Sequence, residues 1–153
     1  MSKLEYILGD LVMTNGISGG TAKNVVYKVM YSNPSKICVS DDGTILKGIV
    51  HLENLEDAKL EDEGYLYYGN SYVYFKDIIP IPITPEILEK NGWKSINGKY
   101  ALKIKNANYL VLDFTEDGIY TYINERTMLF VIKYVHELQH LLFGLELNSE
   151  MEV

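Results

Sequence analysis

The stretch KYVHELQHLLFG, from Lys133 to Gly144, carries the strongest helix pattern in the chain and organises its second half. At 100° per residue, one apolar stripe gathers Val135, Leu138, Leu142 and Leu145. Gly144 suits the helix end because glycine tolerates the left-handed backbone found just past a helix. Burying these four side chains contributes roughly 6–12 kcal/mol before entropy is subtracted. We therefore expect a helix that packs on a sheet.

The same stretch contains His-Glu-x-x-His, the zinc-hydrolase motif, at His136, Glu137 and His140. Two histidines one helical turn apart could bind zinc as neutral ligands, with Glu137 as general base on a zinc-bound water. A catalytic zinc also needs a third protein ligand. His51 lies in a distant β-rich region, and no second predicted helix holds the tail carboxylates of Glu146, Glu150 and Glu152. We therefore favour a solvated helix face and keep a minimal zinc metallohydrolase as the alternative.

The composition of the chain limits the classes of protein to which it can belong. Of the 153 residues, 47% are hydrophobic, which is enough for a real core. The formal net charge of −7 argues against broad binding to DNA or RNA. Cys38 is the single cysteine, so no internal disulfide can form. With no signal-peptide core and no run long enough to cross a membrane, we expect a cytoplasmic protein.

The first half, residues 1–79, has the pattern of short strands. Turn residues separate runs of β-branched and aromatic side chains at 4–13, 25–31, 36–40, 44–52, 65–68 and 71–79. The last two runs should pair as a hairpin around Gly69 and Asn70. The acidic segment 53–64 has no strong apolar period and should be a loop or a short solvated helix. Such short, regular strands predict a small, SH3-like antiparallel β-barrel.

A loop rich in glycine and small polar residues, Thr14 to Asn24, follows the first strand. Loops of this kind can point several backbone N–H groups at a phosphate. This one departs from the P-loop pattern because two residues separate Gly20 from Lys23. We expect a long hairpin connection, and keep as the alternative a phosphate cradle built from Gly19, Gly20, Thr21 and Lys23.

The second half, residues 80–153, changes character at the proline-rich run Pro80–Pro85. Thr84 suits an N-cap and Pro85 a first helical position, which predicts a short helix ending at Asn91 and Gly92. Four strands should follow as a meander at 99–105, 109–114, 119–123 and 127–132. We therefore predict an α+β protein of two domains, 1–79 and 80–153, which could also share one continuous core.

Two C-terminal segments carry a family resemblance. Residues 79–93, IPIPITPEILEKNGW, resemble the "IPLTEEWLLKFGF" segment of a family of small uncharacterised proteins of Bacteroidetes and their phages. Residues 132–143, IKYVHELQHLLF, resemble that family's closing "IKYVHQLQNLYFAL" helix, and Gly9–Val12 resembles its "IGNLV" opening. In the family pattern Gln commonly stands at the position of Glu137 and Asn at that of His140. The resemblance therefore implies a helix that needs no zinc, in a phage or mobile-element setting.

Our leading functional hypothesis is a non-enzymatic phage-type binding protein with a counter-defence role. It would sequester a nucleotide immune signal or block a host defence protein; an accessory protein of the virion or of replication is a further alternative. A nucleotide needs aromatic stacking and cationic donors. The expected ligand-binding residues are Trp93, Tyr100, Lys103 and Lys105, with the glycine-rich loop supplied by another subunit. We expect a homo-oligomer, because a barrel and an open meander both leave edges to cover.

Overall fold

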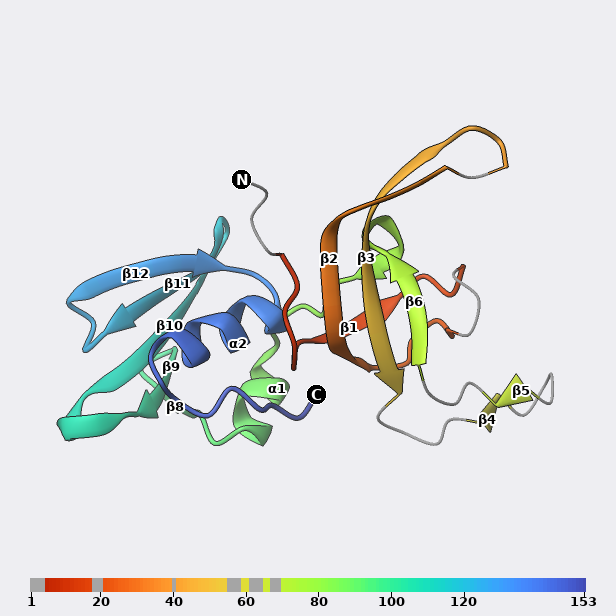
Figure 1. The fold of residues 1–153 in the computed structure, drawn as a ribbon. Helices are drawn as coiled ribbons and strands as arrows, with labels where there is room; N and C mark the ends of the chain where they lie inside the picture. The colour runs from red at the N-terminus through yellow and green to blue at the C-terminus, as the bar shows by residue number, and fades with distance from the viewer. Residues whose placement is uncertain (1–4, 18–20, 40, 55–58, 61–64, 67–69) are drawn as a thin grey trace. The chain divides into compact units, whose positions relative to one another are not determined.

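The computed structural model of the chain describes residues 5–17, 21–39, 41–54, 59–60, 65–66 and 70–153 (Figure 1). The chain divides into two compact units, 1–81 and 82–153. Both are mainly antiparallel β-structure, and two α-helices complete the second, which confirms the predicted α+β class. No helix in the described part is long and apolar enough to span a bilayer.

The first unit is built on one five-stranded antiparallel sheet. Its strand order is β6-β3-β2-β1-β7, formed by β1 (Leu11–Thr14), β2 (Tyr27–Val39), β3 (Ile45–Asn54), β6 (Asn70–Tyr74) and β7 (Ile78–Ile79). A short 3-10 helix, η1 (Phe75–Asp77), separates β6 from β7. The strands β4 (Lys59–Leu60) and β5 (Tyr65–Leu66) pair separately. Among the described residues no pairing between β6 and β7 closes the sheet into a barrel.

One face of this sheet buries an apolar cluster formed by Tyr6, Val12, Tyr27, Val29, Val50, Leu52, Val73 and Ile78. Gly48 lets the Phe75 ring pack directly over β3, because a Cβ at Gly48 would lie 2.7 Å from that ring. Its φ of +87° is also a conformation that glycine adopts at little cost. A buried carboxylate, Asp77, accepts a 3.1 Å hydrogen bond from the Asn15 side-chain amide and fixes the chain just after β1.

Three strand predictions in the first unit were wrong. Among the described residues, the run 4–13 becomes a strand only from Leu11, because Ile7 and Asp10 close a turn in which the Asp10 carboxylate accepts a 2.9 Å hydrogen bond from the Ile7 N–H. The runs 25–31 and 36–40 are one continuous strand, β2, because a register shift between Asn33 and Ile37 places Pro34 where no ladder donor is required. The predicted hairpin of 65–68 with 71–79 was also wrong, as far as the described residues of the two runs show. Instead β5 pairs with β4, β6 pairs with β3, and β7 pairs with β1. Gly69 and most of the acidic segment lie outside the described residues.

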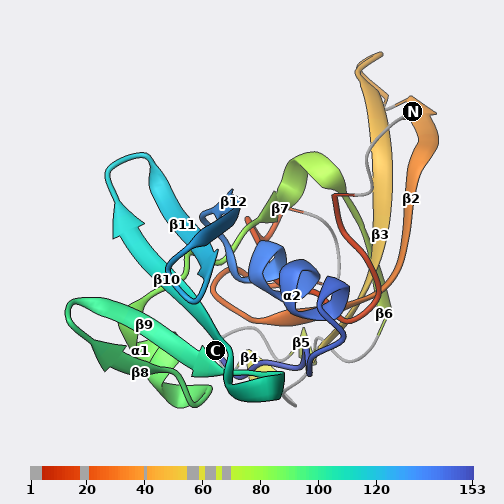
Figure 2. The ribbon, with the colours of Figure 1, turned by 90° about the vertical axis from the view of Figure 1, so that its left-hand side faces the viewer.

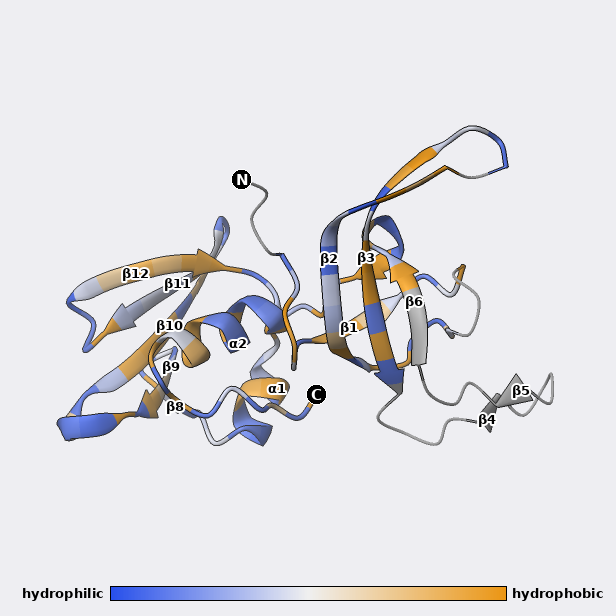
Figure 3. Cartoon of the chain, in the orientation of Figure 1, coloured by the Kyte–Doolittle hydropathy of each residue, from blue (hydrophilic) through white to orange (hydrophobic). Residues whose placement is uncertain are grey.

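The distal half of the β2–β3 hairpin forms an arm, residues 36–47, that projects beyond the rest of its sheet (Figure 1). Val39 pairs with Ile45, and Ile37 pairs with Lys47. Directly paired residues share a face, so one face of the arm presents aliphatic side chains that are 59–69% exposed: Ile37, Val39 and Ile45. The apolar colour of the arm is visible in Figure 3.

The second unit is a five-stranded meander carrying two helices (Figure 2). The order is β12-β11-β10-β9-β8, formed by β8 (Lys94–Ile96), β9 (Lys99–Lys103), β10 (Tyr109–Thr115), β11 (Gly118–Ile123) and β12 (Thr127–Ile132). The predicted strands appear as β9 to β12, and β8 is added at the edge. A 3-10 turn, η2 (Lys105–Ala107), joins β9 to β10.

Both helices of the second unit follow from local signals. In α1 (Pro85–Lys90) the Thr84 hydroxyl accepts a 3.3 Å hydrogen bond from the Ile87 N–H, as the N-cap prediction requires. The long helix α2 (Val135–Gly144) lies along one face of the meander. The C-terminal tail is held too, because Asn91 exchanges side-chain hydrogen bonds of 2.7 and 2.8 Å with the Glu152 backbone.

Candidate functional site

One face of the meander gathers cations around a tyrosine. Lys99, Ala101 and Lys103 alternate along β9, so their side chains leave the same face. Strand register adds their direct partners to this face: Lys94 and Val111 lie opposite Ala101, and Tyr109 lies opposite Lys103. We call Lys94, Lys99, Lys103 and Tyr109 the lysine face. It carries three cations on a chain of net charge −7, and the Asp113 side chain, two residues beyond Val111 in β10, leaves the same face.

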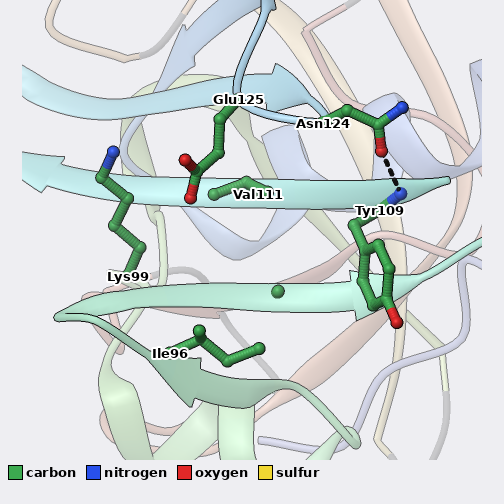
Figure 4. A pocket seen from close by; sticks show the side chains of 7 residues that line it. Ile96, Lys99, Tyr109, Val111, Asn124 and Glu125 are labelled. Carbon is green, nitrogen blue, oxygen red and sulfur yellow. Dashed lines mark hydrogen bonds between the residues drawn. The ribbon is translucent and has the colours of Figure 1, made fainter.

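A pocket of about 280 Å³ opens on this face, lined by Ile96, Lys99, Ala101, Tyr109, Val111, Asn124 and Glu125. Its floor is apolar, because Val111 is only 4% exposed and Ala101 lies beside it. The Lys99 ammonium and the Glu125 carboxylate point into the same end, and the Tyr109 ring stands at the other (Figure 4). A flat ligand with polar edges would fit between these groups.

Asn124 fixes the rim of the pocket. Its Oδ1 accepts a 2.8 Å hydrogen bond from the Tyr109 N–H, and its N–H donates a 2.9 Å bond to the Tyr109 carbonyl. Its Nδ2 donates a 2.8 Å bond to Asn108 Oδ1. The side chain of Asn124 therefore ties the turn after β11 to the start of β10. This locks the position of Tyr109 relative to Glu125.

Glu125 itself occupies a strained position. It is the second central residue of the turn Ile123–Arg126, which a 3.1 Å hydrogen bond from Arg126 N–H to the Ile123 carbonyl closes. Both central residues have positive φ, 53° at Asn124 and 59° at Glu125, as in a type I′ turn. Asparagine tolerates this region, whereas glutamate at the second position costs about 1–2 kcal/mol relative to glycine.

The charges of the pocket remain available to a ligand. In the part of the chain that the structure describes, no ion pair within 4.0 Å joins Lys99 to Glu125. The only such pair recorded there, Lys76 with Asp77, belongs to the first unit. Because both pocket side chains lie near water, their mutual attraction is weak. A ligand carrying both an acceptor and donors can therefore engage them without breaking a strong contact.

In the structure, the three residues of the His-Glu-x-x-His motif contact the backbone and the aromatic rings of α2 and the residues just before it. Glu137 Oε1 accepts hydrogen bonds from the backbone N–H groups of Lys133 at 2.9 Å and Tyr134 at 3.1 Å. The imidazole rings of His136 and His140 stand edge to face with centroids 5.7 Å apart, and Tyr134 stacks on His136 at 6.0 Å. Across the described ranges, no group of three or more His, Cys, Asp or Glu is placed to hold a metal ion.

The predicted solvated face for this motif was wrong at His136, which is only 4% exposed. The buried side of α2 is broader than the predicted aliphatic stripe, since it also takes in Gln139 and Leu141. Gln139 is satisfied there by a 3.1 Å hydrogen bond from its Nε2 to the Ser149 carbonyl. Polar side chains that find such partners can be buried, and hydropathy alone does not reveal the partners.

The other predicted ligand-binding residues are spread over different surroundings. Trp93 is only 3% exposed, which favours the role of core anchor over that of a stacking platform. Tyr100 lies on the face opposite Lys103, where its ring meets Phe114 edge to face at 5.9 Å. Lys105 is exposed in η2. Of the predicted set, only Lys103 belongs to the lysine face.

The predicted phosphate cradle belongs to the first unit. Thr21 is buried and Lys23 is exposed, whereas Gly19 and Gly20 lie outside the described residues. The loop connects β1 to β2, which pair with each other. The Tyr27 hydroxyl accepts a 2.8 Å hydrogen bond from the Ala22 N–H, and a Cβ at Gly16 would lie 3.1 Å from the Lys23 nitrogen. These close backbone approaches give the small residues of the loop a packing role.

Sequence reasoning missed Tyr109, Lys99, Asn124 and Glu125. Tyr109 had a usable signal, because pairing the predicted strands across the Asn106–Asn108 turn puts it opposite Lys103. Glu125 had none, since its approach to the pocket depends on the long-range bonds of Asn124. Comparison with protein-family models, with curated proteins and with solved structures finds no match.

Proposed function

We propose that the chain is a non-enzymatic binding protein that holds a small nucleotide in the pocket beside Tyr109. The observation that carries this proposal is the lysine face, which combines an aromatic ring, an apolar floor and three cations within an acidic chain. A base can stack on a tyrosine ring, and lysine ammonium groups bind phosphate oxygens by charge-assisted hydrogen bonds. Both requirements of a nucleotide are met on one surface.

The chemistry of the lining supports binding rather than reaction. The ionisable groups that line the pocket are one ammonium, one carboxylate and one phenol. This set offers no hydrogen-bonded pair of nucleophile and base of the kind that covalent catalysis needs. Glu137, the alternative catalytic residue, is engaged at the start of α2. The resemblance to the phage-associated family would make the ligand a nucleotide signal of host immunity, which sequestration would silence.

The test is isothermal calorimetry on the full chain with nucleoside monophosphates and cyclic nucleotides. We expect a dissociation constant below about 1 mM for at least one of them. Lys103→Glu should weaken that binding by about tenfold or more, because it replaces a phosphate donor by a repelling charge. The matched control is Lys133→Glu, an exposed lysine just past the opposite edge strand, β12. Absence of binding by every nucleotide, or equal losses in both variants, would refute the proposal.

We also infer that the first unit is a small SH3-like barrel. Its strand order places β7 beside β1 and β6 at the far end, and η1 immediately precedes β7. Because the three residues of η1 join two strands at opposite ends of the order, the sheet has to curl to bring those ends toward each other. Hydrogen exchange tests the inference. A curled barrel should protect the amides of β7 and β1 as strongly as those of β3, whereas an open sheet would expose its short edge strand first.

The arm of the first unit supports a second candidate function, the blocking of a host protein. Its exposed Ile37, Val39 and Ile45 lie on one face of a projecting hairpin, and exposed apolar patches mark interaction sites. The test is chemical cross-linking in host extract with the full chain. A specific adduct that Ile37→Ser plus Ile45→Ser removes would support this function. An adduct pattern identical in both proteins would reject it.

A further inference from the structure

We infer that the pocket selects its base, and that the base is guanine. This inference rests on the proposed nucleotide-binding function. It concerns the end of the pocket where the Lys99 ammonium and the Glu125 carboxylate converge (Figure 4). The pocket's other end, with Tyr109 and the neighbouring Lys103, would take the flat face and the phosphate. The two charged tips would therefore meet the edge of the base.

The edge of guanine matches this pair of groups in order. Going round its Watson–Crick edge, guanine presents an acceptor (O6) and then two adjacent donors (the N1 and N2 hydrogens). A carboxylate accepts two parallel N–H bonds in bidentate fashion, and an ammonium can only donate. Glu125 would take the two donors while Lys99 donates to O6. The cation and the carboxylate are neighbours in the pocket, as the acceptor and donors are neighbours on the base.

The other bases mismatch the same pair. Adenine presents an acceptor, N1, beside its amino group, so a carboxylate facing that edge meets one lone pair with another. Cytosine has the same defect at N3, and uracil offers a single donor between two acceptors. A site that hydrogen-bonds a specific donor pattern rejects ligands lacking it strongly, because its own polar groups are then left unpaired. Guanine alone satisfies both oxygens of Glu125.

The turn that carries Glu125 is consistent with a functional side chain. Three turns of the meander have asparagine followed by a second residue at positive φ: Asn97 with Gly98, Asn106 with Ala107, and Asn124 with Glu125. Glycine is the residue that this second position favours. Ala107 shows that this position also tolerates a short side chain with no polar group. What distinguishes Glu125 is that its carboxylate points into a pocket, opposite a lysine.

The pair of variants Glu125→Gly and Ala107→Gly separates binding from backbone strain. Both place glycine at a positive-φ position, so both should raise the melting temperature. Only Glu125→Gly removes a group from the pocket. We expect it to abolish the preference for guanine, and we expect Ala107→Gly to leave that preference intact. Glu125→Gln, which keeps the side-chain volume but can accept at one atom only, should weaken the preference without the change in melting temperature.

Calorimetry with GMP, IMP and AMP on the full chain decides the inference. Wild-type protein should bind GMP about tenfold or more tighter than AMP, with IMP between them because it lacks the N2 donor. Equal binding of GMP and AMP would overturn guanine selection and leave the nucleotide function standing. Binding of none of the three, together with binding of a free amino acid, would overturn both, since a zwitterion also matches Lys99 and Glu125. Retained preference in Glu125→Gly would overturn the assigned role of Glu125.

Discussion

Glu137 Oε1 lies 3.1 Å from the backbone nitrogen of Tyr134 and accepts its hydrogen bond. The same oxygen accepts from Lys133 N–H at 2.9 Å. The first N–H groups of a helix have no partner within the helix, and a glutamate at its third position can reach back to the residue before the helix. The residue that a zinc hydrolase would use as general base is therefore used here to fix the chain entering α2.

This contact predicts the ranking of two substitutions at Glu137. Glu137→Ala should lower the free energy of unfolding by about 1 kcal/mol, as loss of a cap does. Glu137→Gln should retain most of the stability, because the amide oxygen can accept the same bonds. Urea denaturation measures both, with the exposed Glu89→Ala on α1 as the control. A Gln variant as unstable as the Ala variant would show that charge, and not acceptance, is what the helix needs.

Thr121 has an equally specific structural role. It is fully buried, and it stands where the pairing of β11 with β12 shifts register between Tyr120 and Tyr122. Its hydroxyl donates to the Phe130 carbonyl at 2.8 Å and accepts from the Phe130 N–H at 3.0 Å. A side-chain hydroxyl thus supplies the ladder contacts that the irregularity removes from the backbone.

Thr121→Val should therefore destabilise the chain although the two side chains have the same shape. It leaves the Phe130 N–H and carbonyl without these bonds, which should cost about 2 kcal/mol in denaturant titration. Thr127→Val at the exposed start of β12 is the matched control, and it should change stability by no more than about 0.5 kcal/mol. Equal effects at the two sites would mean that the hydroxyl bonds contribute nothing net.

Gly48 allows steric overlap to be separated from backbone strain. An added Cβ there would lie 2.7 Å from the Phe75 ring, at a φ of +87°. Gly43 has a similar φ of +84°, but a Cβ added to it meets nothing within 4 Å. Gly43→Ala should therefore cost about 1–2 kcal/mol from backbone conformation alone. Gly48→Ala should cost a further 1–3 kcal/mol or so from overpacking.

Chemical denaturation of the two glycine variants gives both numbers. The double change Gly48→Ala with Phe75→Leu should recover part of the excess, because it removes ring atoms from the contact. If Gly48→Ala and Gly43→Ala lower the free energy of unfolding equally, the Phe75 ring moves aside without a free-energy cost. The close approach of the ring to Gly48 would then not contribute to stability.

The second half of the fold was more predictable than the first because its signals are local. The turns at 106–108, 116–118 and 124–126 each specify a hairpin between adjacent strands, and Thr84 with Pro85 specifies where α1 begins. In the first half, the pairing of β7 with β1 joins residues more than sixty positions apart. The continuity of β2 through Pro34 depends on a register shift that its partner imposes.

The pocket shows the same division. Lys103 could be anticipated from alternation along one strand, whereas its true aromatic neighbour is Tyr109 and not Tyr100. Side chains alternate between the two faces of a sheet, so an odd-numbered error in position assigns a side chain to the wrong face. The rim of the pocket was beyond such reasoning, because Asn124 reaches Tyr109 across 15 positions of sequence. Single-sequence periodicity carries no information about that bond.

Asn124 provides the last prediction, which concerns the rim of the pocket. Asn124→Gly keeps the backbone freedom that its φ of 53° requires and removes only the side-chain bonds to Tyr109 and Asn108. We expect a loss of about 1–2 kcal/mol in the free energy of unfolding. Each lost hydrogen bond should cost about 1 kcal/mol, and relief of backbone strain should offset part of that loss. Ligand binding at Tyr109 should also weaken by about tenfold, since the ring and Glu125 are no longer held in register.

Asn106→Gly is the control for this experiment. Asn106 has nearly the same backbone conformation, with a φ of 61°, in a neighbouring turn that does not line the pocket. It should keep the affinity of the wild type and gain slightly in stability. In Asn124→Gly both the calorimetric affinity and the urea midpoint should therefore fall. In Asn106→Gly the affinity should stay the same while the urea midpoint rises slightly. A wild-type affinity in Asn124→Gly would mean that the pocket forms without its amide bridge, and that Tyr109 is positioned by the sheet alone.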